Sequence, residues 1–207
     1  MSDHSHRPRH RVQRLLGRFR RDRRGVAAVE FALILPILAL LALGCFEVPR
    51  YVLLWQRLER TSSGVSDLVA QADEPITTNQ MTDIFSAAKI MMQPYAILTS
   101  GSIVVTSINN PTGGAGVKNT WRIACGTVNN IGKLGAVGAT PTVTAFPNAL
   151  LPTIDNEVLV TEVYFTYTPV FKTYIYTGST LYAVAYTRPR NHNLTTSPNT
   201  PTPVVCP

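Results

Sequence analysis

One long apolar run dominates the pattern of hydrophobic and polar positions. The 21 residues from Val26 to Phe46 contain a single charged side chain, Glu30. As a helix, this run would be about 31 Å long at a rise of 1.5 Å per residue, which matches the roughly 30 Å hydrocarbon core of a bilayer. The pattern therefore predicts one transmembrane helix. A carboxylate in hydrocarbon is costly, so Glu30 requires a partner or a function.

Apolar residues then recur from Val48 to Ala72, mostly three or four positions apart. This spacing predicts that the helix continues, with one buried stripe, to about Gln71. Pro36 and Pro49 each remove a backbone donor and can kink it. Pro75 disfavours helix at the residue before it, so we expect a break there. A second helix is predicted from Asn79 to Met92, with its apolar face made by Met81, Ile84, Phe85, Ala88 and Met92.

From Ser100 onward the chain is rich in Val, Ile, Thr and Tyr, punctuated by Gly, Asn and Pro, as is typical of strands and turns. The predicted strands are Ile103–Ile108, Asn119–Cys125, Val158–Thr168 and Leu181–Thr187. We expect an α+β fold in which a long N-terminal helix, transmembrane and extended outward, packs against an antiparallel sheet. The loop at residues 126–155 is unusually long, so it contains a short helix near Ala149 to Leu151 or forms a surface for a partner.

Charge divides the chain sharply. The first 25 residues hold nine Arg against Asp3 and Asp22, a balance of +7, and the remaining residues hold ten basic against ten acidic side chains. A basic tail beside an apolar helix indicates membrane orientation, with the tail cytoplasmic, and argues against nucleic-acid binding. The predicted organisation is a leader (1–25), a transmembrane helix (26–46), its amphipathic extension (47–72), an extracytoplasmic α+β domain (73–190) and a Pro/Thr-rich tail (191–207). In a bacterium, this places the anchor in the inner membrane and the domain in the periplasm.

Three other kinds of N-terminal signal compete with a retained anchor. A secretory signal peptide has a shorter apolar core and a small-residue cleavage site. The arginine pairs suggest a twin-arginine signal, and LALGC, which ends at Cys45, suggests a lipoprotein signal. None of the three explains a carboxylate at Glu30.

The junction G-V-A-A-V-E-F suggests a use for that carboxylate. Cleavage after Gly25 would make Val26 the new amino terminus and Glu30 the fifth residue of the mature chain. Residues four apart share one face of a helix. The new ammonium group could therefore pair with the carboxylate of Glu30, in the same chain or in a neighbouring one.

The segment RRGVAAVEFALILPILALL resembles the N-terminal signature of TadE-like and TadF-like proteins, the minor pseudopilins of the Flp or Tad pilus, a branch of the type IV filament superfamily. The family pattern of Gly, four residues, Glu and an aromatic residue corresponds to Gly25, Val26 to Val29, Glu30 and Phe31. The resemblance implies cleavage after Gly25 by a membrane-embedded aspartic prepilin peptidase, and a role for Glu30 in processing or assembly.

The same resemblance implies other pseudopilins and the major Flp pilin as partners. Phe31 stands where that small pilin usually has Tyr, and the chain is several times longer, so we expect a minor component. EVYFTYTPVF (residues 162–171) and AYTRPR (residues 185–190) resemble the late portion of TadE-like proteins less specifically.

Cys125 and Cys206 both fall in the predicted oxidising compartment. We favour a disulfide between them, which would tether the C-terminal tail to the sheet. The alternative is that Cys125 is a small core residue and Cys206 a free thiol.

The sequence offers no convincing catalytic or metal site, and we expect no enzyme activity, cofactor or metal. The histidines are His4, His6 and His10 in the leader and His192 near the C-terminus, on opposite sides of the predicted membrane. Glu162 is either a functional carboxylate or a paired structural one. Asp155 and Glu157 mark the polar start of a strand. Two alternatives stay open: an uncleaved single-pass periplasmic binding or adhesion protein, and an exported enzyme with an atypical signal.

Overall fold

The computed structural model describes residues 24–73, 75–111, 116–128, 132–142, 150, 153, 156–170, 178–190, 194, 196–198 and 204–207. The chain divides into two compact units, Met1–Phe46 and Glu47–Pro207. Helix α2 (Arg24–Ala70) begins in the first unit and ends in the second. By length and composition, this helix can cross a membrane.

In the first unit, every described side chain from Gly25 to Ala42 is exposed. Neither Pro36 nor Pro49 interrupts α2, although each removes one backbone donor from the helix. An apolar helix that packs against none of the described residues of its unit is suited to surroundings of lipid or other helices.

The second unit is built on one sheet of four antiparallel strands in the order β2-β1-β3-β4. The strands are β1 (Gly101–Asn109), β2 (Lys118–Gly126), β3 (Glu157–Tyr167) and β4 (Ser179–Thr187). They confirm the four predicted strands to within one or two residues. Alternation in β2 is also as predicted, because Trp121, Ile123 and Cys125 are buried while the residues between them are partly exposed.

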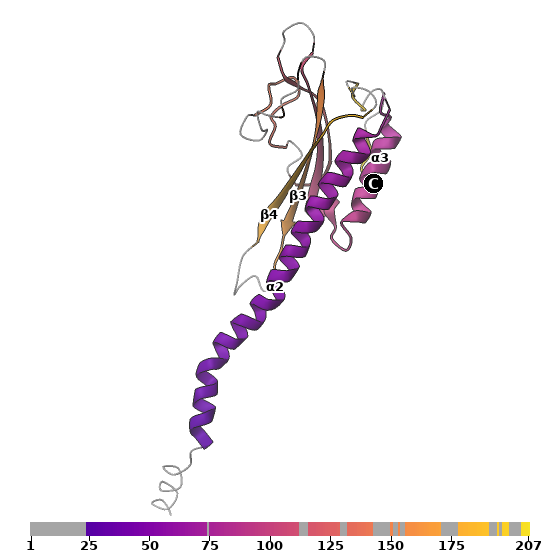
Figure 1. Ribbon diagram of the computed structural model, residues 1–207. Coiled ribbons are helices and arrows are strands. Elements are labelled where there is room, and N and C mark those ends of the chain that lie inside the picture. Colours follow the sequence, from indigo (N-terminus) through magenta and orange to yellow (C-terminus); the bar gives the residue numbers. More distant parts are fainter. Residues whose placement is uncertain are drawn as a thin grey trace, which may run out of the picture. The chain divides into compact units, whose positions relative to one another are not determined.

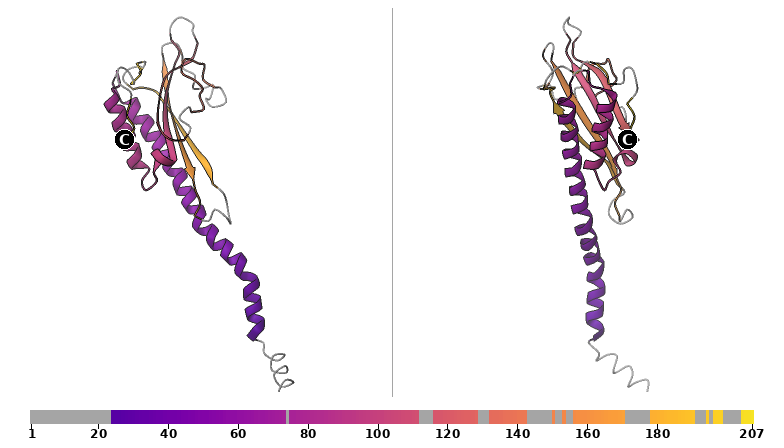
Figure 2. Two further views of the ribbon diagram at one scale, coloured as in Figure 1. Left: turned by 180° about the vertical axis from the view of Figure 1, so that it is seen from behind. Right: turned by 90° about the vertical axis from the view of Figure 1, so that its right-hand side faces the viewer.

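Helices cover one face of this sheet (Figures 1 and 2). The C-terminal half of α2 lies beside α3 (Thr78–Met91), and a short helix, α4 (Ile97–Ser100), leads into β1. After the break at Pro75, α3 begins with a capping box, in which the Thr77 side chain and Gln80 satisfy each other's backbone N–H groups. The core between helices and sheet includes Leu54, Leu58, Val65, Val69, Met81, Phe85, Ile103, Val105, Trp121, Val163 and Phe165.

The opposite face of the sheet has a second, smaller core. It consists of Ile108, Leu134, Val158 and Val160, with Leu150 packed against it. Leu134 and Leu150 come from the long loop, so part of the segment for which we considered a partner-facing role covers the chain's own sheet. Apart from Leu150, the short helix expected near Ala149 to Leu151 lies outside the described residues. The architecture is thus α+β, with a long N-terminal helix packed against a four-stranded antiparallel sheet.

Candidate functional site

The first candidate site is the junction at the start of α2. Gly25 and Val26 lie in its first turn, and Glu30 and Phe31 follow one turn later. A Cβ atom at Gly25 would meet no other atom within 4 Å. Packing among the described residues therefore does not require glycine there.

Val26 and Glu30 are four residues apart on one continuous helix, so their side chains project from the same face. Both are exposed. Among the described residues, none donates a hydrogen bond to Glu30 or forms an ion pair with it. The carboxylate of Glu30 therefore points outward and has no partner in the described part of the chain.

Glu30 stands within an apolar surface that surrounds the helix. Its exposed large side chains are Val26, Val29, Phe31, Leu33, Ile34, Leu35, Ile37, Leu38, Leu40, Leu41 and Phe46. Because these residues lie on all sides of the helix, the surface is not a single docking stripe. It is suited to a lipid environment or to packing among several helices.

Glu47, the first residue after the apolar run, has the opposite environment. It is only 5% exposed. The Tyr167 hydroxyl donates to its Oε1 atom, and the Val170 N–H donates to Oε2 at 3.3 Å. Burial raises the pKa of the Tyr167 phenol, and the hydrogen bond to Glu47 raises it further. Glu47 thus ties α2 to the end of β3.

This contact was not predicted from the sequence, because Glu47 was interpreted only as the start of the amphipathic extension. The spacing of residues along the helix does indicate that Glu47 faces the core. Glu47, Tyr51, Leu54 and Leu58 follow the three- and four-residue spacing of the buried stripe. A carboxylate in such a stripe needs a buried donor, but the sequence does not say which residue provides it.

Glu162, at the centre of β3, is 0% exposed. Its Oε1 atom accepts from the Lys133 N–H at 2.9 Å and from the hydroxyls of Tyr164 at 2.8 Å and Tyr182 at 3.2 Å. Burial raises the pKa of both phenols, and the charge of Glu162 adds to this effect. These contacts fit the structural interpretation of Glu162 rather than the functional one.

The Glu162 contacts also hold the long loop on the sheet. Lys133 belongs to that loop, and its ammonium nitrogen lies 3.4 Å from the centre of the Tyr182 ring. Arg122 on β2 donates to the carbonyl of Gly135 in the same loop. Burial lowers the pKa of the Arg122 guanidinium, and the Glu162 charge opposes this shift. The buried carboxylate of Glu162 and the partly buried guanidinium of Arg122 therefore compensate each other's charge beneath the loop.

Replacing Glu162 with Gln should destabilise the outer domain. The substitution keeps one acceptor oxygen but removes the charge that compensates Arg122, so we expect the free energy of unfolding to fall by about 2 kcal/mol. Urea unfolding followed by tryptophan fluorescence measures this change. The matched control is Glu59→Gln, at an exposed position whose carboxylate accepts from the Trp55 indole at 2.7 Å. Equal stability of the two variants would contradict the role assigned to Glu162.

The other acidic residues considered at the start of this strand have separate outcomes. Glu157 is the first residue of β3, is 2% exposed and accepts from the Ser107 hydroxyl. It is therefore a buried, bonded residue rather than only a polar strand start. Asp155 lies outside the described residues.

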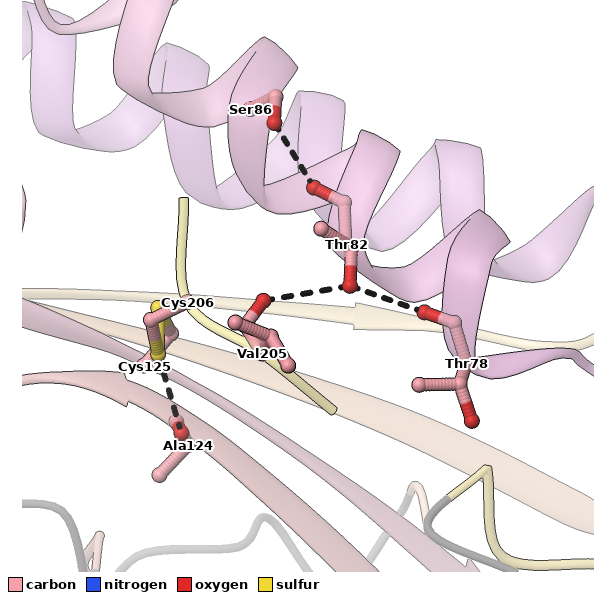
Figure 3. The surroundings of a disulfide bond; sticks show 7 residues. All are labelled: Thr78, Thr82, Ser86, Ala124, Cys125, Val205 and Cys206. Atoms are coloured by element: carbon pink, nitrogen blue, oxygen red, sulfur yellow. Dashed lines mark hydrogen bonds between the residues drawn. A yellow bond between two sulfur atoms is a disulfide. The ribbon is translucent and has the colours of Figure 1, made fainter. Parts of the chain in front are cut away.

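The structure joins Cys125 on β2 to Cys206 in a disulfide, as expected, and leaves Cys45 as an exposed free thiol. Near the bond, the Thr82 hydroxyl of α3 donates to the Val205 carbonyl at 3.2 Å. Figure 3 shows Val205 and Cys206 between α3 and β2. Further back along the tail, the Trp121 indole donates to the Leu194 carbonyl. The described parts of the tail are thus fastened to both the helix and the sheet.

The four histidines all lie outside the described residues. Among the residues that the structure does describe, no group of three or more His, Cys, Asp or Glu side chains is arranged to hold a metal ion.

Residues 25–65 match the family model for TadE-like protein, which confirms the resemblance over that segment. The segments at residues 162–171 and 185–190 lie outside this match, so their resemblance remains an expectation. No curated protein and no solved structure matches the chain.

Proposed function

We propose that this chain, whose residues 25–65 are a TadE-like segment, is a membrane-anchored minor pseudopilin that takes part in assembly of a Flp/Tad-type pilus. Such a pilus would serve export, adhesion or surface attachment. The observation that carries the proposal is Glu30, an exposed carboxylate on an apolar helix with no partner among the described residues, at the family's spacing from Gly25.

The proposed sequence of events begins with orientation. The nine arginines of the leader keep residues 1–25 in the cytoplasm, while α2 crosses the inner membrane and the second unit enters the periplasm. A prepilin peptidase then hydrolyses the Gly25–Val26 bond. Water adds across the peptide bond, leaving a carboxylate on Gly25 and an ammonium group on Val26.

The mature helix then has a positive charge at Val26 and a negative charge at Glu30. Both charges are costly in hydrocarbon when alone, and each is compensated when it meets the opposite charge on a neighbouring pseudopilin or on the major Flp pilin. The exposed apolar side chains of α2 would pack around this pair. In this proposal the protein catalyses no reaction and needs no cofactor or metal, since its function is assembly.

Analysis of the mature N-terminus tests this function directly. Protein recovered from membranes should begin at Val26 in cells that contain the pilus peptidase and at Met1 in cells that lack it. A Met1 terminus in both would overturn the proposal in favour of an uncleaved binding or adhesion protein. Cleavage near Cys45 with release of a soluble product would instead indicate an exported protein.

A further inference from the structure

Within the outer domain, Glu47 joins the start of its helix to the end of β3. This residue is the first of the second unit and is bonded to both Tyr167 and Val170. The Tyr51 ring, one helical turn later, packs edge-on against Tyr167 with 5.4 Å between ring centres. The start of the β3–β4 connection is therefore fastened to the first turn of α2 that follows Phe46.

Around this contact, apolar side chains are exposed rather than buried. Val48 is 62% exposed and Val170 is 54% exposed. Val52 and Leu53 on the next turn of α2 are also exposed, and the Trp55 ring is tilted by 45° from the Tyr51 ring with 6.4 Å between ring centres. We refer to Val48 and Val170 as the Glu47 patch. Next to this patch, the Tyr51 and Tyr167 rings pack against each other.

The position of the patch along the chain indicates what covers it. Val48 lies two residues beyond Phe46, a rise of about 3 Å along the helix. The headgroup layer extends roughly 5–7 Å beyond the hydrocarbon on each side of a bilayer. Tyr and Trp side chains are enriched at this level because their rings are amphipathic. A helix that leaves the hydrocarbon at Phe46 would therefore carry Val48 through the headgroups.

We propose that the Glu47 patch is a lipid-binding surface that seats the outer domain on the bilayer. Val48 on α2 and Val170 at the end of β3 both contact lipid, and Glu47 holds the two segments together. Lipid contacts on two different elements restrict rotation of the outer domain relative to the bilayer. A single helix in contact with lipid would allow that rotation. This inference rests on the membrane span in the proposed function but not on cleavage or pilus assembly.

The test uses the full-length protein in vesicles of phosphatidylethanolamine and phosphatidylglycerol. In a Cys45→Ala background, a fluorescent probe sensitive to its surroundings is attached to Val170→Cys, and lipids with a nitroxide near the headgroup are added as quenchers. We expect loss of fluorescence at position 170. Adding Glu47→Gln should reduce that loss, because the bond holding Val170 beside α2 is weakened.

Val137 is the matched control, because it is also valine and is 53% exposed. Its neighbour Gly138 donates a hydrogen bond to the Asn119 carbonyl on β2. Across the sheet, Asn119 lies opposite Ile108, and Ile108 lies opposite Val158. Val137 is therefore near the end of the sheet where β3 begins, whereas Val170 follows the end of β3. Val158 and Tyr167 are nine residue steps apart along β3, so the probes at positions 137 and 170 should lie about 30 Å apart along the sheet. The probe at Val137→Cys should keep its fluorescence.

A probe at Ile37→Cys, within the apolar run, separates the two possible failures. Quenching at position 37 but not at position 170 would overturn the lipid-binding surface and leave the membrane span intact. No quenching at either position would remove the span as well. A probe at position 170 that is shielded from water but unaffected by nitroxide lipids would mean that a second copy of the protein covers the patch, which also overturns the proposal.

Discussion

Glu30→Gln is expected to leave the outer domain folded and to abolish assembly into the pilus. The substitution removes the charge that a neighbour's Val26 ammonium would meet, and the ammonium then remains uncompensated in hydrocarbon. Breaking a buried ion pair by removing one partner costs about 3–5 kcal/mol. Each 1.4 kcal/mol is about tenfold in an equilibrium constant, so subunit association should weaken by at least a hundredfold.

Immunoblots of sheared pili and of membranes measure this effect. The variant should be present in membranes at the normal level but missing from the pilus fraction, or should remain uncleaved if the peptidase also requires the carboxylate. Either outcome distinguishes a pseudopilin from a plain anchor. A plain anchor should tolerate Gln at this position or insert more readily, because an amide costs less than a charge in lipid.

Glu47→Gln is the matched control, since it makes the same chemical change only 17 positions along the same helix. Glu47 is buried and bonded to Tyr167, whereas Glu30 is exposed. We therefore expect Glu47→Gln to lower the free energy of unfolding of the outer domain by about 1–2 kcal/mol, because a hydrogen bond to a charged group is replaced by a neutral one. Retained assembly in Glu30→Gln, together with lost assembly in Glu47→Gln, would contradict the roles assigned to both residues.

Local patterns predicted the elements of this fold well. The strands were found because stretches rich in β-branched and aromatic residues lie between turn residues. In β2 the expected alternation is also clear in its burial. The second helix was found from its apolar spacing, which places Met81, Ile84, Phe85 and Ala88 inside. These signals depend on neighbours in sequence, so a single chain contains them.

The features that were missed depend on residues far apart in sequence. Glu47 and Tyr167 are separated by 120 positions, and neither carries a local mark of the other. The second core is similar, since Leu134 lies in a segment without periodicity and is buried only because the sheet offers Val158 and Val160 on that face. Glu30 could be identified because a carboxylate within an apolar run is itself a local anomaly. Its proposed partner is still not local, since it belongs to another molecule.

Loss of the Cys125–Cys206 disulfide should produce the largest change in stability. The bond closes a loop with a sequence separation of 81 residues. Loop-closure entropy predicts that removing the cross-link lowers the free energy of unfolding by about 4 kcal/mol. Paired Cys125→Ala and Cys206→Ala substitutions, studied by urea unfolding of the purified protein, test this value. The matched control is Cys45→Ala, which removes an exposed free thiol and should leave stability unchanged.

The different burial of the two cysteines allows the contribution of the cross-link to be separated from that of core packing. Cys125 is buried in the main core, so its replacement by Ala also removes packing, whereas Cys206 is exposed. Cys206→Ala alone therefore removes the cross-link with little loss of packing, and it should account for most of the effect of the double variant. If Cys206→Ala is instead as stable as the parent, the contacts of the tail with Thr82 and Trp121 are sufficient to hold it. The cross-link would then contribute little to the folded domain.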